Sequence, residues 1–61
     1  MDLIVFRLTL DGYVPVLCVS RCPGAAEAEA EARKKYPTSK LKVKVASECT
    51  RAEVAAARAA K

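Results

Sequence analysis

The chain has 61 residues, of which 52% are hydrophobic and 30% are charged, and its formal net charge is +4. This balance excludes a disordered chain, and the length leaves room for one small α+β domain over residues 1–61, with too thin a stability margin to favour a strained catalytic pocket. The positive charge favours acidic partners such as nucleic acid, an anionic protein surface or lipid headgroups, although net charge also keeps small domains soluble.

An antiparallel hairpin is predicted for the first twenty residues. Residues 2–10 are rich in bulky apolar and β-branched side chains, as a strand requires. Asp11-Gly12 has the composition of a two-residue turn, and residues 13–20 form the returning strand. With this turn, Phe6 pairs with Leu17.

The predicted register sorts the side chains of the hairpin onto two faces. The face expected to form the core carries Ile4, Phe6, Leu8, Leu10, Tyr13, Pro15, Leu17 and Val19. The second face carries Val5, Val14, Val16 and Cys18 and is too apolar to meet only water. Its cover is expected to come from the C-terminal helix, from a second copy or from a different protein.

A helix is predicted after Cys22-Pro23-Gly24, because alanine and glutamate are good helix formers and proline is tolerated at a helix start. Pro37 ends it. Its buried stripe is predicted to be Ala25, Ala28, Ala32 and Tyr36, and its ion pairs Glu29 with Arg33 and Glu31 with Lys35.

A third strand is predicted over residues 40–46, where apolar and basic residues alternate. Leu41, Val43 and Val45 are expected to point inward, and Lys40, Lys42 and Lys44 outward. Thr50 and Glu53 have the spacing of a capping box, which predicts a second helix to about Ala60.

The element order is therefore β-β-α-β-α. Proline has no backbone donor, so Pro15 predicts that the second strand lies at an edge, and lysines suit an edge strand as well. The sequence thus predicts a three-stranded, mostly antiparallel sheet in the order 2-1-3, with the first helix packed on one face.

No catalytic constellation is evident, so we expect a non-enzymatic protein without cofactor or metal. The chain has no histidine, and no carboxylates are predicted to be paired in a pocket. Cys18 resembles a small buried hydrophobe, whereas Cys22 and Cys49 precede helix starts, where the helix dipole favours a thiolate. A bridge between Cys22 and Cys49 stays open, and a three-sulfur metal or redox site ranks last because the spacing fits zinc poorly.

A cytoplasmic location is expected from three features. The chain has no recognisable signal peptide and no apolar stretch near the length of a membrane span. Three cysteines are an odd number, which a fully disulfide-paired secreted scaffold would not leave.

Two functions follow as hypotheses. The first is a small protein-binding module of the adaptor, inhibitor or phage-accessory type, dimeric, acting through a sheet face or edge with Val5, Val14, Val16 and Cys18 toward a protein partner or a second copy. The alternative is a basic nucleic-acid-binding domain that uses Arg7, Lys40, Lys42 and Lys44. Against the alternative, Phe6 and Tyr13 are expected on the face opposite these lysines, so stacking aromatics are absent from the basic face.

Overall fold

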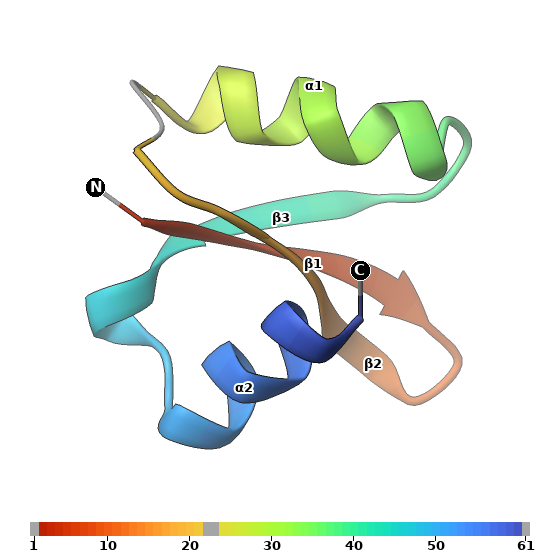
Figure 1. The fold of residues 1–61 in the computed structure, drawn as a ribbon. Helices are drawn as coiled ribbons and strands as arrows, with labels where there is room; N and C mark the ends of the chain where they lie inside the picture. The colour runs from red at the N-terminus through yellow and green to blue at the C-terminus, as the bar shows by residue number, and fades with distance from the viewer. Residues whose placement is uncertain (1, 22–23, 61) are drawn as a thin grey trace.

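A three-stranded sheet forms the middle layer of the molecule, which a computed structural model describes over residues 2–21 and 24–60 (Figure 1). The strands are β1 (Leu3–Thr9), β2 (Gly12–Val19) and β3 (Leu41–Val45). Their order is β2-β1-β3, and β1 pairs antiparallel with both neighbours. The predicted topology and strand order are confirmed.

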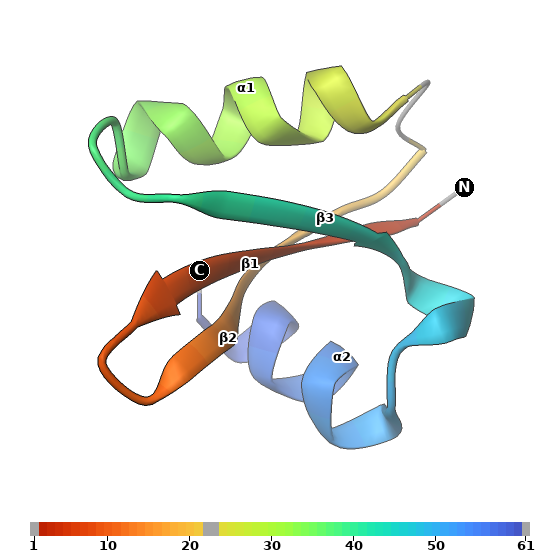
Figure 2. The same ribbon diagram turned by 180° about the vertical axis from the view of Figure 1, so that it is seen from behind.

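Two helices lie on opposite sides of this sheet (Figures 1 and 2). Helix α1 (Ala25–Lys35) lies on one face and α2 (Arg51–Ala59) on the other, and a short 3₁₀ turn, η1 (Ala46–Glu48), leads from β3 toward α2. The predicted helix start at Cys22-Pro23 lies outside the described residues. The second face predicted from the sequence, on which Val5 lies, is covered by α1, whereas α2 covers the face of Ile4 and Phe6, so a cover of the second face by the C-terminal helix was wrong.

The hairpin turn lies one residue earlier than predicted, at Leu10-Asp11. A type I′ turn at Asp11-Gly12 needs positive φ at both residues. Gly12 has a φ of 102°, but Arg21 is the only other described residue with positive φ, so Asp11 does not meet this requirement. The Thr9 hydroxyl closes the turn, because it donates to the Gly12 carbonyl at 2.8 Å and accepts from the Asp11 N–H at 3.2 Å.

The earlier turn makes the predicted pairing of Phe6 with Leu17 wrong, and a β-bulge in β2 shifts the register again beyond Phe6. Phe6 pairs with Pro15 and Val5 pairs with Leu17, so Val16 is one extra residue between two regular segments. An extra residue exchanges the faces of everything beyond it, because side chains alternate along a strand. Beyond the bulge, Leu17 and Val19 therefore lie on the face of Leu3 and Val5, and Cys18 lies on the face of Ile4.

Pro15 lies at the edge of the sheet, as predicted. The Leu8 N–H donates to the Lys40 carbonyl at 3.0 Å, and the Ala46 N–H donates to the Asp2 carbonyl at 2.9 Å. Because bonding directions alternate in antiparallel ladders, the backbone groups of Phe6 also point toward β3. Its partner on the other side, Pro15, then points its nitrogen outward, where the missing N–H breaks no ladder bond.

The face beneath α1 holds the larger apolar cluster. Ala28 and Ala32 are fully buried against Leu3 and Val5, and their short side chains let the helix lie close to the sheet. The half-buried side chains packed around them are Leu17, Val19, Leu41, Val43 and Val45, which confirms the inward positions predicted in β3.

Details of α1 differ from the prediction. Ala25 is exposed, and Tyr36 is only half-buried at the C-cap. The ion pair between Arg33 and Glu29 is present at 3.7 Å, whereas Glu31 pairs with Lys34 at 3.3 Å in place of Lys35.

The face beneath α2 holds a smaller cluster. Ile4, Phe6 and Ala57 are buried there, and the half-buried side chains of Cys18, Ala46, Cys49 and Val54 pack against them. The predicted capping box starts α2, because the Glu53 N–H donates to Thr50 Oγ1 at 3.1 Å and the Thr50 N–H donates to Glu53 Oε1 at 2.8 Å.

Candidate binding surface

Helix α2 covers only part of its side of the sheet. It packs mainly against β2 and less against β1. The apolar cluster beneath α2 draws on β1, β2 and the segment after β3, and none of its described members belongs to β3. The half of this face that belongs to β3 is left open.

The β3 lysines occupy this open half. Lys42 pairs with Phe6 and Lys44 pairs with Ile4, so both lysines lie on the α2 side of the sheet. The Lys40 carbonyl accepts a hydrogen bond from the Leu8 N–H, so Lys40 continues the alternation and lies on the same side as Lys42 and Lys44. The predicted outward orientation of the three lysines is therefore confirmed, and they form a row along the part of the sheet that α2 leaves uncovered.

Two aromatic rings lie against these lysines. Lys42 Nζ is 5.7 Å from the centre of the Tyr13 ring, and Lys44 Nζ is 5.7 Å from the centre of the Phe6 ring. Both distances are within the range of cation–π attraction. The surface formed by Leu8, Tyr13, Lys40, Lys42 and Lys44 is called the lysine face below.

The expectation that Phe6 and Tyr13 lie opposite the lysines is wrong. Phe6, Leu8 and Tyr13 do share one face, as the sequence predicted. The error arose in β3: its apolar residues were assigned to that face, but they pack beneath α1 with Leu3 and Val5. The sequence did hold a clue. Leu3 and Val5 are as apolar as Ile4 and Phe6, so the apolar side chains of β3 could have packed on either face of β1.

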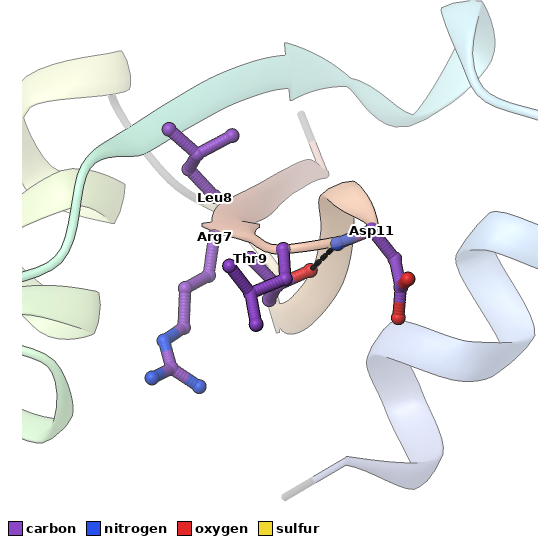
Figure 3. Close-up of a pocket in the computed structure, with 5 residues that line it drawn as sticks. Arg7, Leu8, Thr9 and Asp11 are labelled. Atoms are coloured by element: carbon purple, nitrogen blue, oxygen red, sulfur yellow. Dashed lines mark hydrogen bonds between the residues drawn. The ribbon is translucent and has the colours of Figure 1, made fainter.

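Apolar side chains are exposed at the hairpin end of the lysine face. Leu8 is 41% exposed, Tyr13 46% and Leu10, at the turn, 107%. Residues 7–11 also line an open hollow of about 650 Å³, in which Arg7 and Leu8 point to opposite sides of the strand (Figure 3). Exposed large apolar groups gathered at one place indicate a contact surface.

The lysine charges are not neutralised within the described chain. Over residues 2–21 and 24–60 there are two ion pairs, and both lie within α1. Lys40, Lys42 and Lys44 are all exposed. Their charge is therefore available to an anionic partner.

Arg7 does not belong to this basic surface, so its predicted grouping with the three lysines is wrong. It pairs with Leu41, which places it on the α1 side of the sheet. Its guanidinium carbon is 4.8 Å from the centre of the Tyr36 ring, and its Nε donates to Ser39 Oγ at 3.0 Å. Arg7 therefore holds the connection between α1 and β3.

The four residues predicted to form a protein-binding face are not brought together on one. Val5 is fully buried beneath α1, whereas Cys18 packs in the cluster beneath α2. Val16 is 8% exposed, and Val14 is half-buried beside Arg7. The prediction that they share a face failed because the bulge reverses the alternation of β2.

Cys49 is not placed as an activated thiol. Burial raises the pKa of its thiol, the carboxylate of Glu53 adds to this effect, and Lys44 opposes it. Its Sγ donates to the Val45 carbonyl at 3.5 Å. The predicted thiolate at this helix start is therefore wrong for Cys49. Cys49 is a free cysteine, so the bridge to Cys22 that the sequence left open is not formed, and Cys22 itself lies outside the described residues.

The part of the chain that the structure describes contains no group of three His, Cys, Asp or Glu side chains that could hold a metal ion. It also contains no helix that is long and apolar enough to cross a membrane. Comparison with protein-family models, curated proteins and solved structures gave no match.

Proposed function

We propose that this chain is a non-enzymatic binding module for an acidic protein, and that the lysine face together with Leu10 is its contact surface. One observation carries the proposal: the exposed apolar side chains at the hairpin end adjoin three lysines that have no carboxylate partner in the described chain. A module of this kind acts as an adaptor or an inhibitor by occupying a surface.

The composition of this surface favours protein over other anionic partners. Protein interfaces combine an aromatic and apolar centre with a polar rim, and tyrosine is enriched among their energetically important residues. Here Tyr13 and Leu8 supply the apolar contact. The lysines supply attraction toward carboxylates and discriminate against basic partners.

A second copy is a poorer occupant of this surface than an acidic protein. Two copies would bring two lysine rows together, and each chain already carries a net charge of +4. The self-association expected from the sequence stays a prediction, which sedimentation tests directly: a strict monomer at high concentration contradicts it.

The test uses two acidic polymers of similar length, a random copolymer of glutamate and tyrosine and plain polyglutamate. We expect the copolymer to bind more tightly, because it offers apolar groups to Leu8, Leu10 and Tyr13 as well as carboxylates to the lysines. Replacement of Lys40, Lys42 and Lys44 by glutamine should weaken its binding by about tenfold or more.

A matched control removes the same charge elsewhere. The exposed residues Lys35, Arg51 and Arg58 are replaced by glutamine in the control protein. Binding that falls equally in both triple variants would show a general charge effect and contradict the proposed surface.

Binding of single-stranded nucleic acid is the second candidate function, and the contact of Lys42 with Tyr13 favours it. Such surfaces combine a cationic row with a ring on which bases stack. Tyr13→Leu separates the candidates: it removes stacking but keeps an apolar group. Tighter binding of oligothymidylate than of the glutamate–tyrosine copolymer, lost in this variant, would favour nucleic acid.

A further inference from the structure

The outer edge of β3 carries backbone groups that the sheet does not use. Lys40 and Ala46 direct their hydrogen-bonding groups toward β1. Because the direction alternates along an antiparallel strand, Leu41, Val43 and Val45 direct theirs away from β1. The sheet order places no strand on that side.

Few of these outward groups have a partner within the described residues. The Val45 carbonyl accepts a hydrogen bond from Cys49 Sγ at 3.5 Å. The backbone bonds outside the regular elements include none from Leu41 or Val43. The side chains of Leu41, Val43 and Val45 are also only half-buried, although they belong to the apolar cluster beneath α1.

A strand added at this edge would lie beside apolar and basic residues of β3 in alternation. Residues of the new strand opposite Leu41, Val43 and Val45 would lie on the α1 side and extend its apolar cluster. Residues opposite the lysines would lie on the lysine face, and successive lysines are about 6.6 Å apart along the strand. Opposite charges at such directly facing positions stabilise a strand pair.

We infer that an extended segment of the acidic partner, with apolar and acidic residues in alternation, adds to β3 as a fourth, antiparallel strand. This inference rests on the proposed function and names the way in which the partner is held. Backbone hydrogen bonds to the edge give affinity, and the lysines select the acidic sequence.

The same alternation argues against a second copy as the occupant. Antiparallel pairing of two β3 strands around a twofold axis would place lysine beside lysine, which is destabilising. The lysines therefore protect this edge from self-pairing while leaving it open to a strand of opposite charge.

The test uses a capped heptapeptide of alternating glutamate and valine that begins and ends with glutamate, in two isomeric forms. In one form the three valines are N-methylated, and in the other the last three glutamates are N-methylated, so that both forms carry the same number of methyl groups. Valines opposite Leu41, Val43 and Val45 donate toward β3, whereas the N–H groups of the glutamates point away from it. We expect methylated valine to lower the affinity by about tenfold or more, and methylated glutamate to leave it nearly unchanged.

A readout on the protein locates the contact. Hydrogen exchange of the Leu41, Val43 and Val45 amides should slow when the unmethylated peptide is added, and exchange at Lys42 should change less. As a second variant, Val43→Pro removes one outward donor at an edge, where proline is tolerated, and Val43→Thr is its control. We expect binding to survive the threonine substitution and to fall with the proline.

The outcomes separate this inference from the proposed function. If both methylated peptides bind equally, the lysines hold the peptide by side chains alone, and strand addition is wrong while the lysine face stands. If the heptapeptide does not bind but the glutamate–tyrosine copolymer does, strand addition again fails alone. If neither binds, both proposals fall.

Discussion

The two faces of the sheet differ in how completely a helix closes them. On the α1 face, Ala28 and Ala32 are fully buried against Leu3 and Val5, and aliphatic side chains from all three strands pack around them. On the α2 face the buried cluster is smaller, and the β3 half carries lysines instead. The α1 face is therefore closed over all three strands, whereas the α2 face leaves room for a partner.

The largest expected effect tests whether the smaller cluster still contributes to stability. Ile4 is fully buried on the α2 face, and Ile4→Ala should lower the free energy of unfolding by about 2–5 kcal/mol because it leaves a cavity. Urea denaturation measures this loss. The milder variant Ile4→Val is expected to lower the free energy of unfolding by only about 0.5–1.5 kcal/mol. Equal, small losses in both variants would mean that α2 moves in to fill the space.

A second prediction tests the close approach of α1 to the sheet. Ala32→Leu should destabilise the fold by about 1–3 kcal/mol, because the added methylenes have no space between the helix and Val5. Ala30→Leu, at an exposed position of the same helix, is the control and should change stability little. Thermal or urea unfolding of both variants decides between tight and loose packing on this face.

The two helices also differ at their starts, which gives a third prediction. The Thr50 side chain caps α2, whereas α1 begins at Gly24 without a side-chain cap. Thr50→Ala should cost about 1 kcal/mol and speed amide hydrogen exchange at the start of α2, with α1 unaffected. Thr50→Ser keeps the hydroxyl and should behave as the parent, and equal deprotection of both helices would contradict separate closure of the faces.

The smallest effect concerns the thiol of Cys49 at the rim of the α2 face. Because its pKa is raised in the folded chain, the folded state keeps this proton to higher pH than the unfolded state. The thiol therefore contributes to the free energy of unfolding at pH values below its pKa in the unfolded chain. This contribution is lost as the pH rises through its pKa in the folded chain. A Cys18→Ala, Cys22→Ala protein keeps Cys49 as its reactive thiol. The rate of Cys49 alkylation should begin to rise at a higher pH in the folded protein than in urea. Identical pH profiles of this rate in the two conditions would contradict the prediction.

The sequence was sufficient to predict the elements and their order. Alternation at Leu41, Val43 and Val45, the Thr50–Glu53 spacing and the missing donor of Pro15 each reflect a local rule, and each was confirmed. The face of the sheet on which each side chain lies was harder to predict from the sequence. The φ angle at Asp11 decides the pairing register, and one extra residue at Val16 decides the faces beyond it, and neither is fixed by composition.

The candidate surface was therefore found only in part. The lysine row was predicted from its alternation, but Arg7 was grouped with it and Tyr13 was placed on the other side. Both errors have one origin, because a strand pattern states which side chains share a face but not which helix covers that face.

The bulge at Val16 makes this position unlike any other in the hairpin. If Val16 were deleted, Pro15 would still face Phe6 and Leu17 would still face Val5, so every observed strand pair could be kept in an uninterrupted ladder. The chain could thus be shortened here at the cost of one buried side chain and some twist, whereas removing a neighbouring paired residue would shift the ladder itself.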